Sequence, residues 1–287
     1  MNLLIERLRD AGFGVDSAVP APGGVVALAG LATLEDDTQV FAKTLASASP
    51  DLFEIEAEGL RALTEIGGAH TPEVRLVTPS LLVLAPLHPR GEDKRFWEQA
   101  GRMLAVMHTT AVGDRFGWRR DGWLGRLRQE NTWSTDGHEF FAQRRLLRWL
   151  SEPLVDAAFD REERHALERL CAALPEIVPA QPPVLNHGDL WTENILATAD
   201  GGPVFIDPAV SYTWAESDLS MMWCCTRPPV SERFFSAYAE IAPLHDGWQQ
   251  RMPLLNMREW LSTIAHGDDS WGAADAVRKT IAPFARR

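Results

Sequence analysis

Residues 184–196 have the sequence VLNHGDLWTENIL, in which two apolar runs enclose a dense group of polar side chains. An ordinary buried segment carries few such groups, because each buried polar atom needs a partner. The next apolar run, VFID, ends at Asp207, and Ala-Asp-Gly-Gly at 199–202 predicts a tight turn between the two runs. A hairpin returns the chain to its starting end, so Asn194 and Asp207 are expected to converge near Asp189.

The order of these three side chains matches a pattern of phosphoryl transfer. Asn194 follows Asp189 by five residues, and Asp207 closes the next strand. In protein kinases an Asp accepts the proton of the substrate hydroxyl, while an Asn five positions on and a later Asp bind Mg²⁺, which prefers hard oxygen ligands. The pattern predicts an enzyme that uses ATP and Mg²⁺. A structural turn cluster is the alternative, because this spacing alone also arises by chance.

The flanking segments predict two unlike regions. Residues 18–46 contain short β-favouring runs separated by turn signals, which predicts antiparallel strands, and a helix is expected to begin near Asp51. The apolar run LLVLAP at 81–86 predicts a further strand and a hinge. Later segments carry apolar residues at helical spacing. We therefore expect an α+β fold with a nucleotide-binding sheet and one helix at 1–86, and a mainly helical region at 87–287 that holds the catalytic loop and acceptor site.

A kinase site also needs a lysine that binds phosphate and a helix glutamate that pairs with it. Lys43 ends the strand-like run VFAK, although alone it would more often be a solvated charge. On a helical wheel of about 100° per residue, Glu56 lies within the apolar stripe that contains Phe53. A carboxylate on a buried face needs a charged partner, so Glu56 is predicted to pair with Lys43. Glu54 and Glu58 fall off the stripe and are expected to be solvated.

Composition restricts the class of protein further. The 287 residues carry a formal net charge of −12 and a pI near 5.1, and an acidic surface repels nucleic acid and anionic lipid. No apolar run of about 18 residues is present, and the first residues lack the pattern of a signal peptide. Three cysteines, two of them adjacent, suggest no disulfide framework. We expect a cytoplasmic protein with no nucleic-acid or membrane partner; its oligomeric state is not predicted.

Longer motifs narrow the prediction to one family. The segments HGDLWTEN at 187–194, FIDPA at 205–209 and ESDLSMM at 216–222 resemble the fructosamine kinase family. These proteins, also called ketosamine kinases, form a branch of the aminoglycoside phosphotransferase-like small-molecule kinases. The segment FGWRRDGWLGRLRQENTW at 116–133 agrees with the same family, and the resemblance covers about residues 20–225.

The resemblance implies a bilobal protein-kinase-like fold and a role for each residue of the pattern. Asp189 would be the catalytic base, and Asn194 and Asp207 would bind Mg²⁺. Lys43, paired with Glu56, would orient the phosphates of ATP.

Further positions follow from the same resemblance. His187 would support the catalytic loop without taking part in the chemistry. Trp191 would stack on a sugar-like substrate, with a core anchor as an equal alternative. Gly30 would lie in the loop that covers the phosphates, and Ala85 and Leu87 would contact adenine through backbone groups.

The resemblance also implies structural roles for two acids: Glu216 and Asp218 would brace the helix that follows the metal-binding Asp, with Asp218 able to cap it.

The same family suggests the reaction. Family members phosphorylate the 3-hydroxyl of ketoamines, the fructosamine and ribulosamine adducts of glycation. The implied function is therefore deglycation repair of small-molecule or protein-bound ketoamines. A phosphotransferase for aminoglycosides or choline and a non-catalytic nucleotide-binding module are the competing hypotheses. The acceptor pocket in the C-terminal helices is not defined by the sequence.

Overall fold

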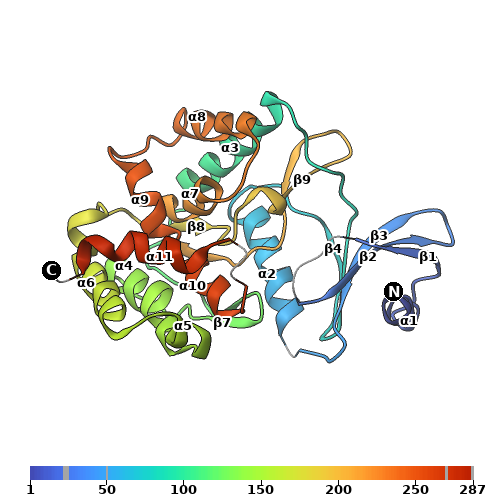
Figure 1. Cartoon of the computed structure of the whole chain (residues 1–287). Helices are drawn as coiled ribbons and strands as arrows, with labels where there is room; N and C mark the ends of the chain where they lie inside the picture. Colours follow the sequence, from blue (N-terminus) through green and yellow to red (C-terminus); the bar gives the residue numbers. More distant parts are fainter. Residues whose placement is uncertain (22–25, 50, 269–270, 286–287) are drawn as a thin grey trace.

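The computed structural model describes residues 1–21, 26–49, 51–268 and 271–285. Figure 1 shows a sheet near the N-terminus on one side of the molecule and a larger helical region on the other, with helix α2 (Leu52–Glu65) between them. The predicted α+β fold, with a small antiparallel sheet and a mainly helical remainder, is confirmed. Where one lobe ends and the next begins stays a prediction.

The sheet is antiparallel, with five strands in the order β1-β2-β3-β5-β4. Its strands are β1 (Val15–Pro20), β2 (Leu28–Leu34), β3 (Gln39–Thr44), β4 (Val74–Val77) and β5 (Leu81–Leu84). Side chains alternate between the two faces of a strand. Val40 and Ala42 of β3 therefore pack with α1 (Asn2–Asp10) on one face, while Phe41 and Lys43 face α2 on the other.

The helical region follows β5. Its α-helices are α3 (Lys94–Thr110), α4 (Gly137–Phe140), α5 (Pro153–Ala158), α6 (Arg161–Ile177), α7 (Ala215–Cys224), α8 (Glu232–Ala239), α9 (Trp248–Leu255), α10 (Met257–Ala265) and α11 (Ala273–Ile281). A π-helical turn, η1 (Phe141–Leu146), and 3₁₀ turns η2 (Leu147–Ser151), η3 (Thr192–Asn194), η4 (Pro229–Ser231) and η5 (Ala282–Phe284) complete the helical elements. Within the described ranges, no helix is both long and apolar enough to cross a membrane.

Short antiparallel strand pairs lie among these helices. They are formed by β6 (Gly122–Leu124) with β7 (Leu127–Gln129), β8 (Val184–Asn186) with β11 (Ser211–Thr213), and β9 (Ile195–Ala197) with β10 (Pro203–Phe205). The third pair is the predicted hairpin, in which Ile195 lies opposite Phe205 and Ala197 opposite Pro203. The hairpin therefore returns the chain from Asn194 to Asp207, as the sequence indicated.

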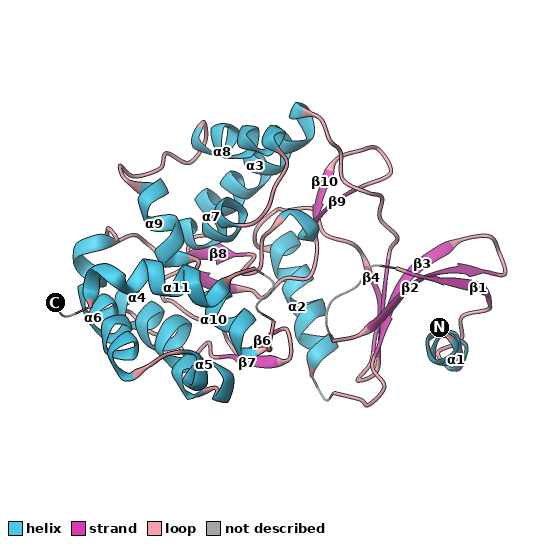
Figure 2. Ribbon diagram, viewed as in Figure 1, coloured by secondary structure: helices cyan, strands magenta, loops and turns pink. Residues whose placement is uncertain are grey.

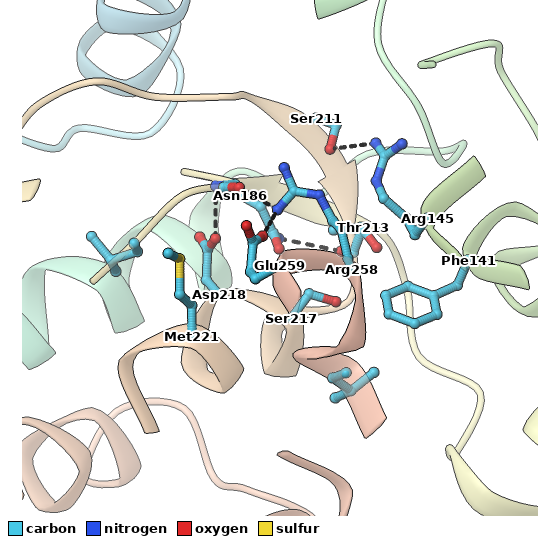
Figure 3. Close-up of a pocket in the computed structure, with 13 residues that line it drawn as sticks. Phe141, Arg145, Asn186, Ser211, Thr213, Ser217, Asp218, Met221, Arg258 and Glu259 are labelled. Atoms are coloured by element: carbon cyan, nitrogen blue, oxygen red, sulfur yellow. Dashed lines mark hydrogen bonds and ion pairs between the residues drawn. The ribbon is translucent and has the colours of Figure 1, made fainter. Parts of the chain in front are cut away.

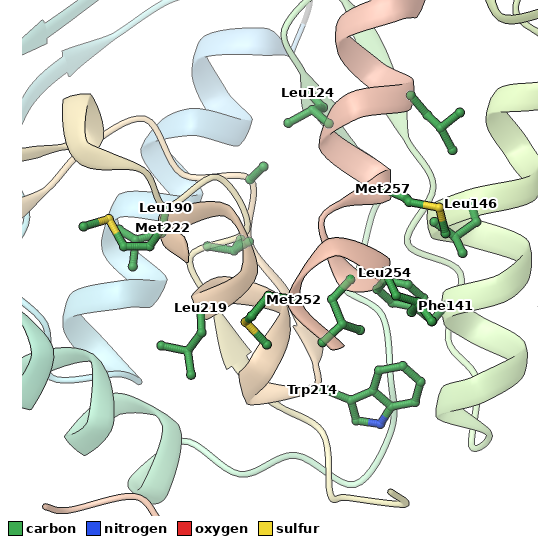
Figure 4. Close-up of a cluster of buried hydrophobic side chains, with 14 of the residues drawn as sticks. Leu124, Phe141, Leu146, Leu190, Trp214, Leu219, Met222, Met252, Leu254 and Met257 are labelled. Carbon is green, nitrogen blue, oxygen red and sulfur yellow. The ribbon is translucent and has the colours of Figure 1, made fainter. Parts of the chain in front are cut away.

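A large apolar cluster holds the helical region together. Figure 4 shows Phe141, Trp214, Leu219 and Met252 converging from η1, the turn before α7, α7 itself and α9. All four are at most 1% exposed. Burial of each such side chain contributes roughly 1.5–3 kcal/mol, so the cluster fixes these helical elements relative to one another.

Helices α3 and α8 approach each other closely at Gly101, and Figure 2 shows the two helices lying together. A Cβ atom on Gly101 would lie 2.1 Å from the carbonyl oxygen of Phe234 in α8. A glycine inside a helix normally destabilises it by about 1 kcal/mol relative to alanine. At this position glycine is required, because the backbone of α8 occupies the space of a methyl group.

We expect Gly101→Ala to reduce the free energy of unfolding by about 2 kcal/mol, because α8 must move away to accept the methyl group. Val106→Ala is the matched control, since Val106 lies on the same helix and is 43% exposed. Urea or thermal unfolding of both variants measures the difference. A Gly101→Ala variant as stable as the wild type would contradict this packing.

Candidate active site

The ammonium group of Lys43 joins three parts of the chain. Its Nζ atom donates to Glu56 Oε1 at 2.8 Å and also to Asp207 Oδ1. The pair that the helical wheel predicted is therefore present. Burial alone would lower the pKa of Lys43. The negative charges of Asp207 and Glu56 have the larger combined effect and raise the pKa of the lysine above its usual value. Burial also raises the pKa of Glu56 to about 7.

Other acids of α2 tie this helix to the helical region. Glu58 is not solvated as predicted: its side chain is 13% exposed and accepts hydrogen bonds from Trp118 Nε1 and Arg119 Nε, both at 2.7 Å. Asp51 precedes the helix but makes no side-chain cap; it accepts from Arg128 Nη1 at 2.8 Å instead. Glu54 is exposed, as expected. The prediction for Glu58 failed because the off-stripe face of α2 is covered by another region.

His187 holds in shape the loop that carries Asp189, the predicted catalytic loop. Its Nε2 donates to the carbonyl oxygen of Ile206 at 2.9 Å, and its Nδ1 accepts from the backbone amide of Asp189 at 3.2 Å. Burial lowers the pKa of His187, which agrees with a neutral ring that carries its proton on Nε2. These contacts connect the catalytic loop to the end of β10 and support the predicted structural role of His187.

Asp218 and Glu216 both brace their surroundings, in ways the sequence did not specify. Asp218 accepts from the backbone amides of His187 at 2.6 Å and Gly188 at 2.7 Å. It does not cap α7, because that helix begins three residues earlier, at Ala215. Glu216 accepts from Arg251 through both carboxylate oxygens, at 2.6 and 2.7 Å. Asp218 therefore clamps the catalytic loop, and Glu216 joins α7 to α9.

Asp189 and Asn194 contact each other at the start of the hairpin. Asn194 Nδ2 donates to the Asp189 carbonyl oxygen at 2.7 Å and to its carboxylate Oδ2 at 3.2 Å. This orientation leaves the amide oxygen of Asn194 for another partner. Burial, followed by the nearby charge of Glu259, raises the pKa of Asp189 to about 8, and a carboxylate of raised pKa is a better proton acceptor near neutral pH.

The oxygen atoms near the hairpin suit Mg²⁺. Lys43 occupies Oδ1 of Asp207, so Oδ2 of Asp207 and the amide oxygen of Asn194 are the available hard ligands. Among the described residues no group of three or more His, Cys, Asp or Glu side chains could enclose a metal ion. Mg²⁺ in kinases is commonly held by one or two protein groups together with water and substrate phosphates, and these two residues fit that arrangement.

Gly30 is not placed as predicted. It lies inside β2, opposite Ala42 of β3, and not in a loop. A Cβ atom at Gly30 would lie 2.5 Å from Met1 Cε and 2.8 Å from Leu4 Cδ2. The glycine therefore allows α1 to pack closely on the sheet. The sequence could not distinguish a packing glycine from one that covers phosphate.

Ala85 and Leu87 follow β5, on the chain that leads to the helical region. The Ala85 amide donates to the carbonyl oxygen of Glu73 at 2.9 Å, so Ala85 could offer adenine its carbonyl group only. The Leu87 amide makes no backbone hydrogen bond within the described residues. A role of both residues in adenine binding stays a prediction.

An arginine that the sequence did not indicate reaches the catalytic loop from α10. Arg258 Nη1 donates to the carbonyl oxygen of Gly188 at 2.5 Å, and Nη2 donates to Gln129. Gln129 in turn donates to the carbonyl oxygen of Ala209 at 2.9 Å. Figure 3 shows Arg258 beside Glu259 and Asp218 in a small pocket of about 20 Å³. Gln129 lies within a motif of the family resemblance, whereas Arg258 follows no motif.

A larger cavity of about 210 Å³ lies next to Asp189. Trp191 lines it, and the Trp191 and Trp271 rings lie 5.2 Å apart between centroids. Glu259 and Trp260 of α10 form part of the same wall. Trp191 therefore faces a space large enough for a sugar-sized molecule, a position that favours the stacking hypothesis over a core anchor.

Comparison with known proteins agrees with this geometry. The family model described as fructosamine kinase matches residues 2–279. The chain belongs to the fructosamine kinase family. It is 32% identical over 235 residues to the protein-ribulosamine 3-kinase of Arabidopsis thaliana, covering 79% of this chain and 71% of the relative. It is also 31% identical over 242 residues to a probable ketoamine kinase of Enterococcus faecium, covering 81% and 83% of the two chains. The protein is accordingly an ATP-dependent ketoamine kinase.

Solved structures share the fold. A Thermobifida fusca protein, provisionally named a fructosamine-3-kinase, superposes with a TM-score of 0.86 at 29% identity, covering 98% of this chain and 99% of that one. The choline kinase LicA of Streptococcus pneumoniae has a TM-score of 0.68 at 16% identity, with 98% of each chain covered. The second likeness shows the kinase-like fold alone.

We expect Asp218→Asn to lower turnover at least about 10-fold and to reduce stability by about 2 kcal/mol. An amide accepts through one oxygen only, so one of the two loop amides would face an NH₂ group and lose its partner. Asp275→Asn is the control, because Asp275 has a 91% exposed side chain. Steady-state ADP release and thermal unfolding check both effects. Unchanged turnover in Asp218→Asn would show that the clamp is dispensable.

Proposed function

We propose that this chain transfers the γ-phosphate of ATP to the 3-hydroxyl of a fructosamine- or ribulosamine-type ketoamine, with Asp189 as the catalytic base. One observation carries the assignment of roles: Lys43, Glu56 and Asp207 meet in a single ion group. Asp189 and Asn194 contact each other at the same open end of the hairpin, where the Ile206 amide donates to the carbonyl oxygen of Asn194. The cavity lined by Asp189 supports a binding site for the acceptor on that side of the catalytic base.

Each residue of the site has a distinct task in this proposal. Lys43, oriented by Glu56, binds the phosphates of ATP, and Asn194 with Asp207 holds Mg²⁺. When bound, Mg²⁺ neutralises charge on the phosphates. Asp189 accepts the proton of the 3-hydroxyl as that oxygen bonds to the γ-phosphorus atom, and ADP leaves. The transfer depends on positioning and electrostatic stabilisation, for which a preorganised site is required.

The biological role and compartment belong to the same proposal. Phosphate on the 3-hydroxyl destabilises a ketoamine, so that the adduct is lost from the amine and the amine is repaired. The acceptor would be a free or protein-bound ketoamine. All three cysteines are free, which supports a reducing compartment such as the cytoplasm, although the relative from Arabidopsis thaliana is named chloroplastic.

Replacement of the base tests the proposed function. We expect Asp189→Asn to retain Mg-ATP binding, measured by thermal shift, and to lose turnover by about 10²- to 10⁴-fold, because the proton of the hydroxyl has no acceptor. ADP release is measured with ribulosamine, fructosamine, aminoglycoside and choline acceptors. Glu168→Gln, an exposed change on α6, is the control. Wild-type turnover in Asp189→Asn, or wild-type activity on an aminoglycoside or choline alone, would contradict the proposal.

The proposed metal ligands are tested by the Mg²⁺ concentration that the enzyme needs for activity. We expect Asn194→Ala to raise the Mg²⁺ concentration needed for half-maximal activity by about 10-fold or more, because one oxygen ligand is lost. Asn194→Asp restores an oxygen and should recover part of the affinity. A titration of activity with Mg²⁺ at saturating ATP measures both. An unchanged requirement in the alanine variant would remove Asn194 from the metal site.

A further inference from the structure

The cavity beside Asp189 has an acidic wall. Three carboxylate side chains line it: Asp189, Glu259 and Asp268. Among its described lining residues there is no lysine or arginine. A cavity with this lining favours a cationic ligand over an anionic one, since an acidic cleft concentrates positive charge.

Two polar residues at the start of α10, Asn256 and Glu259, line this cavity. Asn256 and Glu259 are three residues apart, so they lie on one side of the helix. Asn256 is 3% exposed, and its Oδ1 atom has no hydrogen-bond partner within the described part of the chain. A buried acceptor without a partner is destabilising. A bound ligand that donates a hydrogen bond to Asn256 Oδ1 would remove this cost.

Glu259 is held in position through one carboxylate oxygen, which leaves the other available to a ligand. Arg258 donates to its Oε1 atom, while no hydrogen bond or ion pair of Oε2 is found among the described residues. The Glu259 side chain keeps 13% exposure and lines the cavity. Arg258 also binds the Gly188 carbonyl oxygen, so the carboxylate is fixed relative to the catalytic loop.

Two donor side chains that line the cavity are already engaged within the protein. Thr263 Oγ1 donates to the carbonyl oxygen of Glu259 at 2.8 Å, and His266 Nδ1 lies 2.7 Å from the carbonyl oxygen of Ser262. The same wall offers a ligand the acceptor oxygens of Glu259 and Asn256. A hydroxyl ligand could use donors and acceptors alike, whereas a protonated amine uses acceptors only.

Aromatic rings complete the surroundings of these oxygens. Trp191, Trp260 and Trp271 all line the cavity. The face of an indole ring attracts a cation and also packs against a sugar ring. The combination of a carboxylate, an amide oxygen and indole rings suits a positively charged nitrogen attached to a carbohydrate chain.

We propose that Glu259 and Asn256 form an ammonium-binding subsite, which accepts the N–H groups of the protonated secondary amine of a ketoamine substrate. The inference rests on the proposed function, because it assigns the part of the same acceptor molecule that does not react. Only a short carbon chain separates the amine from the 3-hydroxyl in such a substrate. One cavity lined by both Asp189 and Glu259 can therefore hold the hydroxyl and the amine together.

A matched pair of acceptors tests the subsite. The first is a fructosamine with a secondary amine, and the second is its ether analogue, in which oxygen replaces the nitrogen. We expect Glu259→Gln to raise KM for the amine about 10- to 100-fold while leaving KM for the ether within about 3-fold. Any indirect effect on Asp189 would alter both acceptors equally, so the ratio of the two KM values isolates the charge contact.

Two further variants complete the design. Asn256→Ala should raise KM for the amine by a smaller factor, about 5-fold, again without a matching loss for the ether, and it replaces Glu259→Gln if that variant does not fold. Glu168→Gln, which removes an exposed acid on α6, should leave both KM values unchanged. Thermal shift by Mg-ATP verifies that each variant retains its nucleotide site.

The following outcomes overturn the inference. An equal loss for amine and ether would mean that Glu259 only positions the catalytic loop, and no loss for either would remove it from the acceptor site. A wild-type enzyme that phosphorylates neither acceptor would reject the proposed function itself, and the subsite with it. Turnover of both acceptors by the wild type, without a differential effect of the variants, would reject the subsite alone.

Discussion

The buried positive charge of Lys43 is the constraint on which the site depends. Lys43 is 6% exposed, and a charge in such a position is tolerated only with close partners of opposite sign. Its two partners come from distant parts of the sequence: Glu56 from α2, 13 residues on, and Asp207 from the end of the hairpin, 164 residues on. Satisfying one ammonium group therefore brings the sheet, α2 and the catalytic hairpin to a common point, where phosphate and metal would be bound.

A second set of contacts fixes the loop that carries Asp189. Gly188 has φ of +82°, and a Cβ there would lie 2.1 Å from the carbonyl oxygen of Ala209, so only glycine permits this approach. Its amide is held by Asp218 and its carbonyl by Arg258. With the amide and the carbonyl group of Gly188 both engaged, Asp189, the proposed base, is held in a defined orientation before substrate binds, as electrostatic catalysis requires.

Features encoded by local periodicity could be predicted from the sequence, and features created by packing of distant segments could not. The position of Glu56 on the buried stripe of α2 indicated its pairing with Lys43, and turn chemistry indicated the hairpin. Glu58 was misjudged, because a helical wheel records only the stripe of its own helix and not the segment around Trp118 that covers the opposite face. Arg258 acts on a loop 70 residues away, and nothing near it in the sequence marks that contact.

The position of the transferred phosphate tests the central claim most directly. The 287-residue chain is incubated with Mg-ATP and a fructosamine or ribulosamine, and the product is analysed by ³¹P and ¹³C NMR alongside ADP release. The account predicts one phosphate per ADP, attached to the 3-hydroxyl of the intact ketoamine. Phosphate on another hydroxyl, or ADP release with no phosphorylated ketoamine, would contradict it.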